Sequence, residues 1–209
     1  MHQFQIQANE YLQSPTRGYY HLSYVGYGNL GNPDYINDLK NTFNNEYAEK
    51  LSAAQNSLLA VLRADIPALY AQLGHTELTV CVVPRAKAEH EYHQNQLLFR
   101  SVVSHFVHGF KGTVDGTRYI QRHTNTKTTH LRKEIPNFVN DGPQPYPGIT
   151  AQTCTISPQI ANTHVLLIDD IYTYGVNIDE DAISALLTAG AQSVTFYAVG
   201  KTVSRVSRQ

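Results

Sequence analysis

The sequence contains no tryptophan, one methionine and only two cysteines among its 209 residues. Cys81 and Cys154 are too few for a disulfide framework or a four-cysteine zinc site. No run of 18 apolar residues is present, which excludes an apolar helix spanning a membrane. The first ten residues, MHQFQIQANE, lack the basic start and apolar core of a signal peptide. These absences predict a reduced, soluble, cytoplasmic protein that has no membrane partner.

Charge is also scarce and nearly balanced. Lys and Arg total 16, Asp and Glu total 17, and the formal net charge is −1. This balance argues against binding of nucleic acid or an anionic membrane through bulk charge, although a local basic patch stays open. A hydrophobic fraction of 42% excludes a disordered chain. The length predicts one domain with a sizeable additional element.

The second half of the chain alternates between strand and helix patterns. LTVCVV, residues 78–83, is a continuous apolar run that predicts a strand buried on both faces, and 89–108 shows helical spacing. HVLLIDD predicts a second buried strand that ends in two acids, followed by a turn. A helix over 179–189, stopped by Gly190, and a strand over 193–202 complete a βαβ unit. We therefore predict an α/β fold, with a central, mostly parallel sheet flanked by helices.

The first 75 residues have a different character, because seven of the 14 tyrosines lie within the first 50. A strand is predicted over 19–25 and a helix over 46–64. Asp65 is placed to cap a second short helix after Pro67. We expect two parts: an N-terminal hood and helical element over 1–75, and an α/β core over 76–209.

The segment after the acid pair Asp169-Asp170 has two kinds of binding group. A loop that opens a helix offers free backbone N–H groups and a positive dipole end, which suit a phosphate, and Gly175 allows a tight turn. The two acids would repel a phosphate, but they suit sugar hydroxyls or Mg²⁺. A ribose 5-phosphate combines these two halves.

HVLLIDDIYTYGVN resembles the phosphoribosyl pyrophosphate (PRPP) signature of type I phosphoribosyltransferases: four apolar residues, two acids and a Thr/Gly-rich phosphate loop. The similarity extends through the next helix to SVTFYAVGKT. More loosely, VVPRAKAEHEYHQNQLL is similar to the ComF-like branch of that family. The resemblance implies a Mg²⁺-dependent transfer of ribose 5-phosphate between PRPP and a nitrogen acceptor, either a nucleobase or an amine. It also makes a homodimer one option for the assembly.

The resemblance implies roles for particular residues on the ribose side of the site. Asp169 and Asp170 would bind the ribose 2- and 3-hydroxyls, directly or through Mg²⁺. The backbone cradle of the 5-phosphate would consist of Thr173, Tyr174, Gly175, Val176 and Asn177.

The resemblance also assigns the pyrophosphate side. Arg85 and Lys87, with Ala86 between them, would meet the pyrophosphate after the first buried strand. Arg122 or Lys127 would close over it from a basic, Thr-rich segment that corresponds to the mobile catalytic loop of the family. Positive charge near the leaving pyrophosphate would then accelerate the reaction.

Two positions depart from the family pattern and support a rival reading. Tyr174 stands where a small hydroxyl residue is usual, and Asn177 stands where Thr or Ser is usual, although Asn177 can still cap the helix. Both changes favour a non-catalytic PRPP- or nucleotide-binding protein, or a ComF-like accessory protein. The intact acid pair favours the enzyme.

Other readings of these motifs are weaker. The acidic strand also resembles that of a P-loop NTPase, but the chain contains no G-x-x-x-x-G-K-[ST]. His90 and His93, like His105 and His108, are spaced to share a helix face and ligate a metal, or to be structural histidines. The basic run 111–133 would suit nucleic acid, but it has few interleaved aromatics, so a phosphate lid is preferred.

Overall fold

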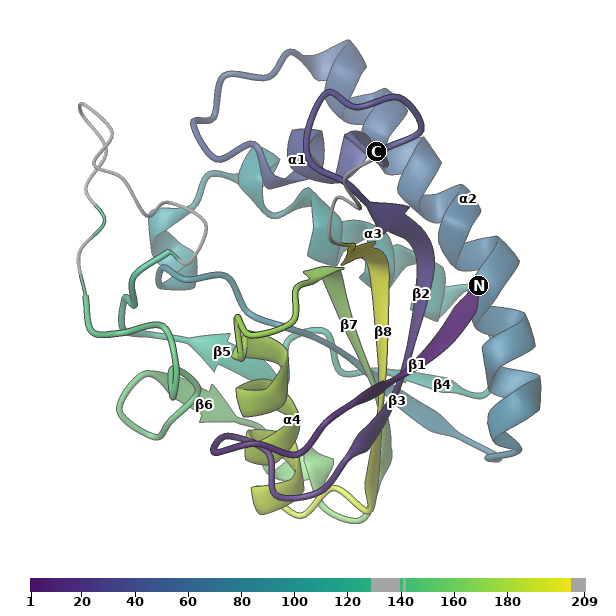
Figure 1. The fold of residues 1–209 in the computed structure, drawn as a ribbon, viewed down its shortest axis with the longest axis vertical. Helices are drawn as coiled ribbons and strands as arrows, with labels where there is room; N and C mark the ends of the chain where they lie inside the picture. The colour runs from purple at the N-terminus through teal and green to yellow at the C-terminus, as the bar shows by residue number, and fades with distance from the viewer. Residues whose placement is uncertain (129–139, 141, 204–209) are drawn as a thin grey trace, which may run out of the picture.

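A six-stranded sheet forms the centre of the molecule, which we describe from a computed structural model covering residues 1–128, 140 and 142–203. The strand order is β1-β2-β8-β7-β3-β4, and every neighbouring pair is parallel except β1 with β2 (Figure 1). The predicted α/β class is therefore confirmed. The strands are β1 (His2–Ile6), β2 (Thr16–Tyr24), β3 (Leu78–Val82), β4 (Thr113–Asp115), β7 (His164–Tyr172) and β8 (Ser193–Thr202).

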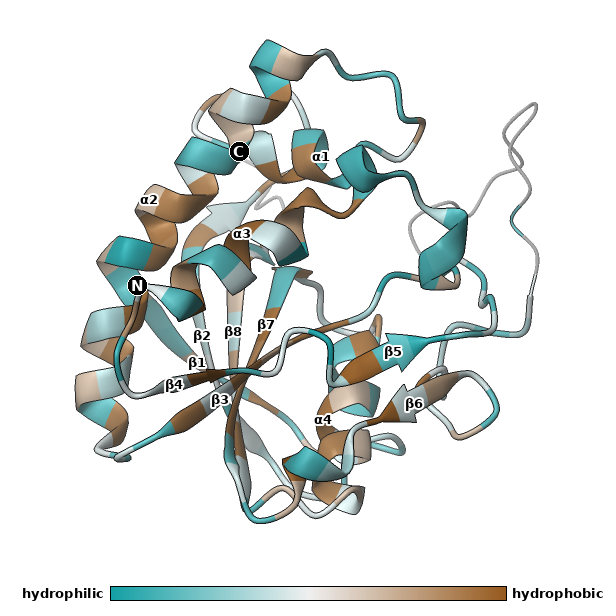
Figure 2. Cartoon of the chain, turned by 180° about the vertical axis from the view of Figure 1, so that it is seen from behind, coloured by the Kyte–Doolittle hydropathy of each residue, from teal (hydrophilic) through white to brown (hydrophobic). Residues whose placement is uncertain are grey.

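Helices cover both faces of the sheet. Three of them pack with one hydrophobic core on one face, and α4 packs with a second core on the other face, beside a small antiparallel pair of β5 and β6. Figure 2 shows α2 with alternating hydrophobic and hydrophilic bands, as expected for a helix with one buried face. The elements are α1 (Tyr35–Lys40), α2 (Ala48–Leu73), α3 (Leu98–His108), α4 (Ile178–Thr188), β5 (Ile120–Arg122), β6 (Cys154–Ile156) and three short 3₁₀ turns at Glu89–Glu91, Gln94–Gln96 and Pro158–Ile160.

The N-terminal element contributes directly to this sheet. β2 pairs in parallel with β8, and Tyr19 shares a core with residues of α2, β3 and β7. Residues 25–47, which follow β2, are not part of the sheet and pass over its carboxyl edge. We call residues 25–47, which include α1, the cover segment. Within the element predicted over 1–75, this segment is the part that borders the carboxyl edge, whereas β1, β2 and α2 belong to the sheet and its packing.

Helix α2 is one continuous helix of 26 residues, so the predicted break at Pro67 is wrong. A proline in a helix interior removes one backbone hydrogen bond, and tertiary packing can outweigh that loss. Leu58, Leu62, Ile66 and Leu69 are fully buried along this helix. Asp65 is also buried and makes tertiary contacts instead of capping a second helix.

The helix predicted over 89–108 begins only at Leu98. His90 and His93 lie in or beside two separate 3₁₀ turns, so they do not share a helix face. Within the described ranges, no group of three or more His, Cys, Asp or Glu residues is arranged to hold a metal ion. None of the described helices is long and apolar enough to cross a membrane.

At α4 the prediction is nearly right. Ile183 and Leu186 are fully buried, and Gly190 follows the helix with a φ of +95°. Leu187, by contrast, is 40% exposed. The predicted strand ending at the acids is also too short, because β7 remains paired with β8 as far as Tyr172.

Candidate functional site

The acid pair lies at the carboxyl edge of the sheet, on strand β7 between β3 and β8. Asp169 is paired with Ala198 of β8, and both acid side chains are half-buried. Three segments meet around them: the β3 loop (residues 83–88), the β7–α4 loop (residues 173–177) and the cover segment. This is the edge at which parallel α/β sheets bind ligands.

Lys40, the last residue of α1, makes an ion pair with the acid pair. Its Nζ lies 3.0 Å from Oδ1 of Asp170, and the two side chains are 24% and 20% exposed. Burial lowers the pKa of Lys40, but the charges of Asp170 and Asp169 outweigh burial and raise it. The ammonium is therefore charged at neutral pH. The sequence analysis missed this residue.

Arg85, predicted to meet the pyrophosphate, binds backbone instead. Its Nη1 donates to the carbonyl of Lys40 at 2.7 Å and to the carbonyl of Gln96, and its guanidinium lies 4.3 Å from the centre of the Tyr92 ring. The buried Gln96 side chain in turn donates to the carbonyls of Asn41 and Thr42. Arg85 and Gln96 therefore fasten the cover segment to the β3 loop.

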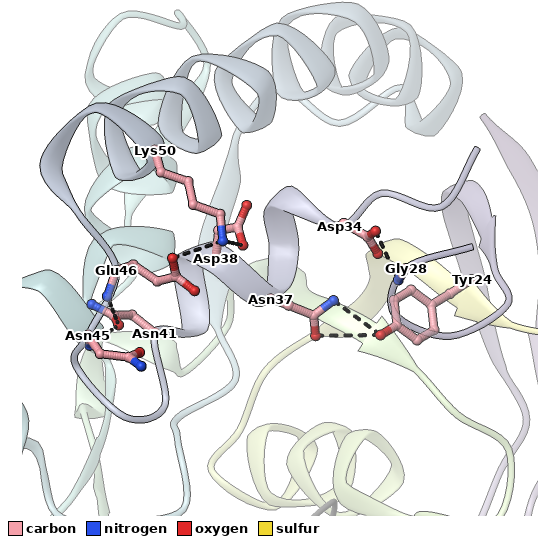
Figure 3. A network of polar contacts seen from close by, with 9 residues as sticks. All are labelled: Tyr24, Gly28, Asp34, Asn37, Asp38, Asn41, Asn45, Glu46 and Lys50. Atoms are coloured by element: carbon pink, nitrogen blue, oxygen red, sulfur yellow. Dashed lines mark hydrogen bonds and ion pairs between the residues drawn. The ribbon is translucent and has the colours of Figure 1, made fainter. Parts of the chain in front are cut away.

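The cover segment also has polar contacts of its own, shown in Figure 3. The Tyr24 hydroxyl and the Asn37 side-chain amide are hydrogen-bonded to each other. Lys50 of α2 makes ion pairs with Asp38 and with Glu46, both at 2.8 Å. These contacts hold α1 against the start of α2, and Lys40 is part of α1.

A third carboxyl group, Asp179 of α4, lies against Asp169. Burial and then the charge of Asp170 raise the pKa of Asp169 to about 7. A hydrogen bond between the carboxyl groups of Asp169 and Asp179 acts in the opposite direction on Asp169. Burial and then the charge of Asp169 raise the pKa of Asp179 well above its usual range. The Asp179 side chain is buried, and its Oδ1 has no hydrogen-bond partner among the described residues. Both pKa shifts favour a proton shared between these two carboxyl groups.

The β7–α4 loop is a tight turn, as predicted. The Val176 N–H donates to the Thr173 carbonyl at 3.1 Å, and Gly175 has a φ of +78°. The hydroxyls of Thr173 and Thr202 lie 2.6 Å apart, which ties the loop to the end of β8. The Tyr174 side chain is 80% exposed and points away from the protein. The turn thus offers backbone groups at the start of α4.

Asn177 stands at the N-cap position but does not cap α4. Its φ is +59°, its side chain makes no capping bond, and its Oδ1 accepts a hydrogen bond from Asn9. The expected capping role is therefore wrong. Two further acids of the first helical turn have protein donors: Glu180 accepts from the Tyr172 hydroxyl, and Asp181 accepts from the N–H groups of residues 148 and 149.

Arg122 and Lys127, predicted on a mobile loop, lie in a packed segment. Arg122 is on strand β5 and only 6% exposed, and it donates to the carbonyls of Arg85 and Gly148. Thr126 is buried and bonded to the Ala86 carbonyl, whereas the Lys127 side chain is exposed. Residues 117–128 therefore include buried positions as well as exposed ones, and the burial of Arg122 does not fit the mobile loop predicted for it. Residues 129–133 lie outside the described residues.

Two cavities open on either side of the acid pair. The basic cavity, of 360 Å³, lies over the β3 loop and includes Ala86 in its lining. The cover cavity, of 600 Å³, lies between the cover segment and the β7–α4 loop, and its lining includes Thr173, Val176 and Asp179. Six cationic side chains line the basic cavity: Lys40, Arg85, Lys87, Arg100, Arg122 and Lys127. Its four acids are Glu89, Glu91, Asp169 and Asp170. This excess of cations suits a phosphorylated ligand.

The acid pair fits a protein-bound Mg²⁺ poorly in this arrangement. Mg²⁺ is usually held by one or two carboxylates together with substrate oxygens and water. Here the Asp170 carboxylate already contacts the Lys40 ammonium, and the Asp169 carboxyl contacts Asp179. The predicted Mg²⁺ at Asp169 and Asp170 stays a prediction, which would require Lys40 to move.

No known protein-family profile matches the chain, and no curated protein sequence is similar to it.

Proposed function

We propose that the carboxyl edge of this sheet binds PRPP and that the protein transfers ribose 5-phosphate between pyrophosphate and a nitrogen acceptor, a nucleobase or an amine. One observation carries the proposal. The acid pair lies between a turn that opens helix α4 and a cavity whose lining includes six cations and four acids. A ligand with sugar hydroxyls flanked by two phosphate groups matches this order of binding groups.

Each part of PRPP has a counterpart in the site. The carboxylates of Asp169 and Asp170 would accept hydrogen bonds from the ribose hydroxyls. The backbone of the β7–α4 loop would hold the 5-phosphate, and the basic cavity would hold the pyrophosphate. In the transfer, the bond from ribose C1 to the pyrophosphate oxygen breaks, a bond from C1 to the acceptor nitrogen forms, and the acceptor loses a proton. Cations lining the basic cavity, Lys40 among them, would stabilise the charge that develops on the pyrophosphate.

A second candidate, a protein that binds PRPP or a nucleotide without catalysis, is favoured by one group of contacts. The Arg85 guanidinium is used in backbone hydrogen bonds, and the Asn177 side chain is turned toward Asn9. Neither side chain points freely into the site, so binding could persist while catalysis is weak. Binding without pyrophosphate release would support this candidate.

Calorimetry and a pyrophosphate-release assay test both candidates. We expect PRPP to bind the wild type and to bind Asp170→Asn at least tenfold more weakly, because the amide is a poorer acceptor for hydroxyls. Glu77→Gln, an exposed acid before β3, is the control. Titrations with and without Mg²⁺ test the metal prediction, a panel of nucleobases and amines tests the acceptor, and light scattering tests the homodimer. Unchanged affinity in Asp170→Asn would remove the proposal.

A further inference from the structure

Lys40 occupies the junction of the two cavities. It lines both of them, as do Asp169 and Asp170. Its ammonium lies 3.0 Å from Asp170, and both side chains are mostly buried. Any ligand that reaches the acid pair from either cavity therefore meets this ammonium as well.

The position of Lys40 is built into the fold. Its carbonyl accepts a hydrogen bond from Arg85, which also binds the carbonyl of Gln96. The residue after it, Asn41, ends α1 in the left-handed conformation, and the carbonyl of Asn41 accepts a hydrogen bond from Gln96. The backbone on both sides of the lysine is thus fixed by Arg85 of the β3 loop and by the buried Gln96 side chain, unlike that of an ordinary surface lysine.

The Lys40 ammonium lies in an acidic part of the site. Three carboxyl groups gather here, on Asp169, Asp170 and Asp179, and the Asp179 Oδ1 has no hydrogen-bond partner among the described residues. These three are not arranged as a metal-binding group, but the pair Asp169 and Asp170 could hold a largely hydrated divalent ion if no other cation lay on it. The ammonium already lies on it, and a second cation beside the first would be repelled.

We propose that Lys40 is the resident cation of the acid pair and takes the place of a protein-bound divalent metal ion. The ammonium then serves the ligand directly, by supplying positive charge to the phosphate group that enters from the basic cavity. The replacement of a metal ion by Lys40 follows from the ion pair with Asp170 alone. The contact between the ammonium and a ligand phosphate rests on the proposed function.

Lys50 offers a matched control. It makes two carboxylate contacts, with Asp38 and Glu46, and it belongs to the same N-terminal part of the chain (Figure 3). It does not line either cavity. Lys50→Met therefore frees a different pair of carboxylates, Asp38 and Glu46 of the cover cavity, and leaves the Lys40 ammonium in the protein.

The metal statement is tested with Mn²⁺ alone, by electron paramagnetic resonance of the free ion. We expect wild type and Lys40→Arg to show no site tighter than about 1 mM, and any site gained in Lys50→Met should persist when Asp170→Asn is added to that variant. Lys40→Met should gain a site at least tenfold tighter, and adding Asp170→Asn to it should remove that site. The proposal would be overturned if wild type bound Mn²⁺ as tightly as Lys40→Met does and if Asp170→Asn abolished that binding. So would the absence of any gain in a folded Lys40→Met, as judged by circular dichroism.

The ligand statement is tested by calorimetry with PRPP in EDTA and in Mg²⁺. We expect wild-type affinity to change less than threefold between the two conditions, whereas Lys40→Met should bind at least tenfold more weakly in EDTA and recover in Mg²⁺. Wild-type binding that is lost in EDTA would overturn it. If PRPP does not bind in either condition, the proposed function fails, and the Mn²⁺ experiment still decides the role of Lys40.

Discussion

The hydroxyl of Tyr197 on β8 donates a hydrogen bond of 2.9 Å to the carboxylate of Asp65, in the middle of helix α2. His21 of β2 contacts the same carboxylate oxygen at 2.9 Å, and the N-terminal amine lies 3.8 Å from the other oxygen. Burial and then the charge of Asp65 raise the pKa of Tyr197 well above its usual range, so the phenol remains a donor. One buried acid therefore joins two strands to the longest helix.

We expect Asp65→Ala to lower the free energy of unfolding by about 2–3 kcal/mol, because it leaves the Tyr197 hydroxyl buried without an acceptor. Tyr197→Phe removes the donor and keeps the other contacts of Asp65, so its loss should be smaller, about 1 kcal/mol. Urea denaturation monitored by circular dichroism measures both. A loss below about 0.5 kcal/mol in Asp65→Ala would show that the contact contributes little.

Stability should fall as the pH rises from about 4 to 8. The Asp169 pKa is raised from 3.8 to about 7 in the folded protein, and the Asp179 pKa is also raised. The folded state therefore holds protons that the unfolded chain has already lost. As the pH rises and these protons leave the folded state, the free energy of unfolding decreases. Asp179→Asn removes one of the two acids, so we expect it to be more stable than wild type at pH 8 by on the order of 1–2 kcal/mol.

Urea denaturation at pH 5 and pH 8 checks this expectation. Glu77→Gln, remote from the site, should keep the wild-type dependence on pH. Equal slopes in wild type and Asp179→Asn would contradict the shared proton.

Tyr174→Thr should strengthen binding of a phosphate ligand. The tyrosine ring is 80% exposed, so its hydroxyl lies in solvent. A threonine hydroxyl at the same position is closer to the backbone and could donate to a phosphate held in the turn. Such a charge-assisted bond contributes roughly 1.5–3 kcal/mol before solvent competition, so we expect about a tenfold gain in affinity. Calorimetry with ribose 5-phosphate measures it. Weaker binding would mean that the tyrosine itself contacts the ligand, which would favour the specialised binder.

Gly175→Val should weaken that binding, and the reason is conformational. A Cβ at Gly175 would meet no atom within 4 Å, but the φ of +78° is strained for a β-branched residue. Gly175→Asn is the matched variant, because Asn tolerates this region better. We expect the Asn variant to keep at least a third of the wild-type affinity and the Val variant to lose about tenfold. Equal affinities would show that the turn does not need its left-handed residue.

Hydrogen exchange should be slow at β5 even without ligand. Ile120 and Arg122 are buried, and the strand is paired with β6. Protection follows burial and hydrogen bonding, so the amides of this strand should exchange more slowly than those of the exposed turn around Gly28. Mass spectrometry of peptic fragments, with and without PRPP, measures both segments. Fast exchange over 120–122 would support the mobile segment that the sequence first suggested.

The strands of the core and the acid pair were predictable from the sequence because they depend on local pattern. LTVCVV and HVLLIDD are apolar runs long enough to cross a sheet buried on both faces, and polar residues near their ends must meet at one edge. The βαβ order in the last sixty residues then fixed the parallel pairing of β7 with β8.

The contacts that decide the state of the site were not predictable, because they join segments that are distant in sequence. Lys40 ends a six-residue helix with no motif around it, and its role depends on where Arg85 holds its carbonyl. Asp179 looked like an ordinary first-turn acid, and only the packing of α4 brings it against Asp169. Arg122 looked like a loop cation, although it is a buried strand residue with backbone partners.

The place of β2 in the sheet has a consequence for how the protein is made. β2 lies beside β8, and the residues in register are almost the whole chain apart. On a ribosome, β2 must therefore wait until nearly all of the protein has emerged before its parallel partner exists. Contacts of such long range slow folding, because a large loop must close before they form. A nascent chain stalled before residue 193 would lack β8 and so would have two separate halves of a sheet with exposed apolar strands, a target for chaperones.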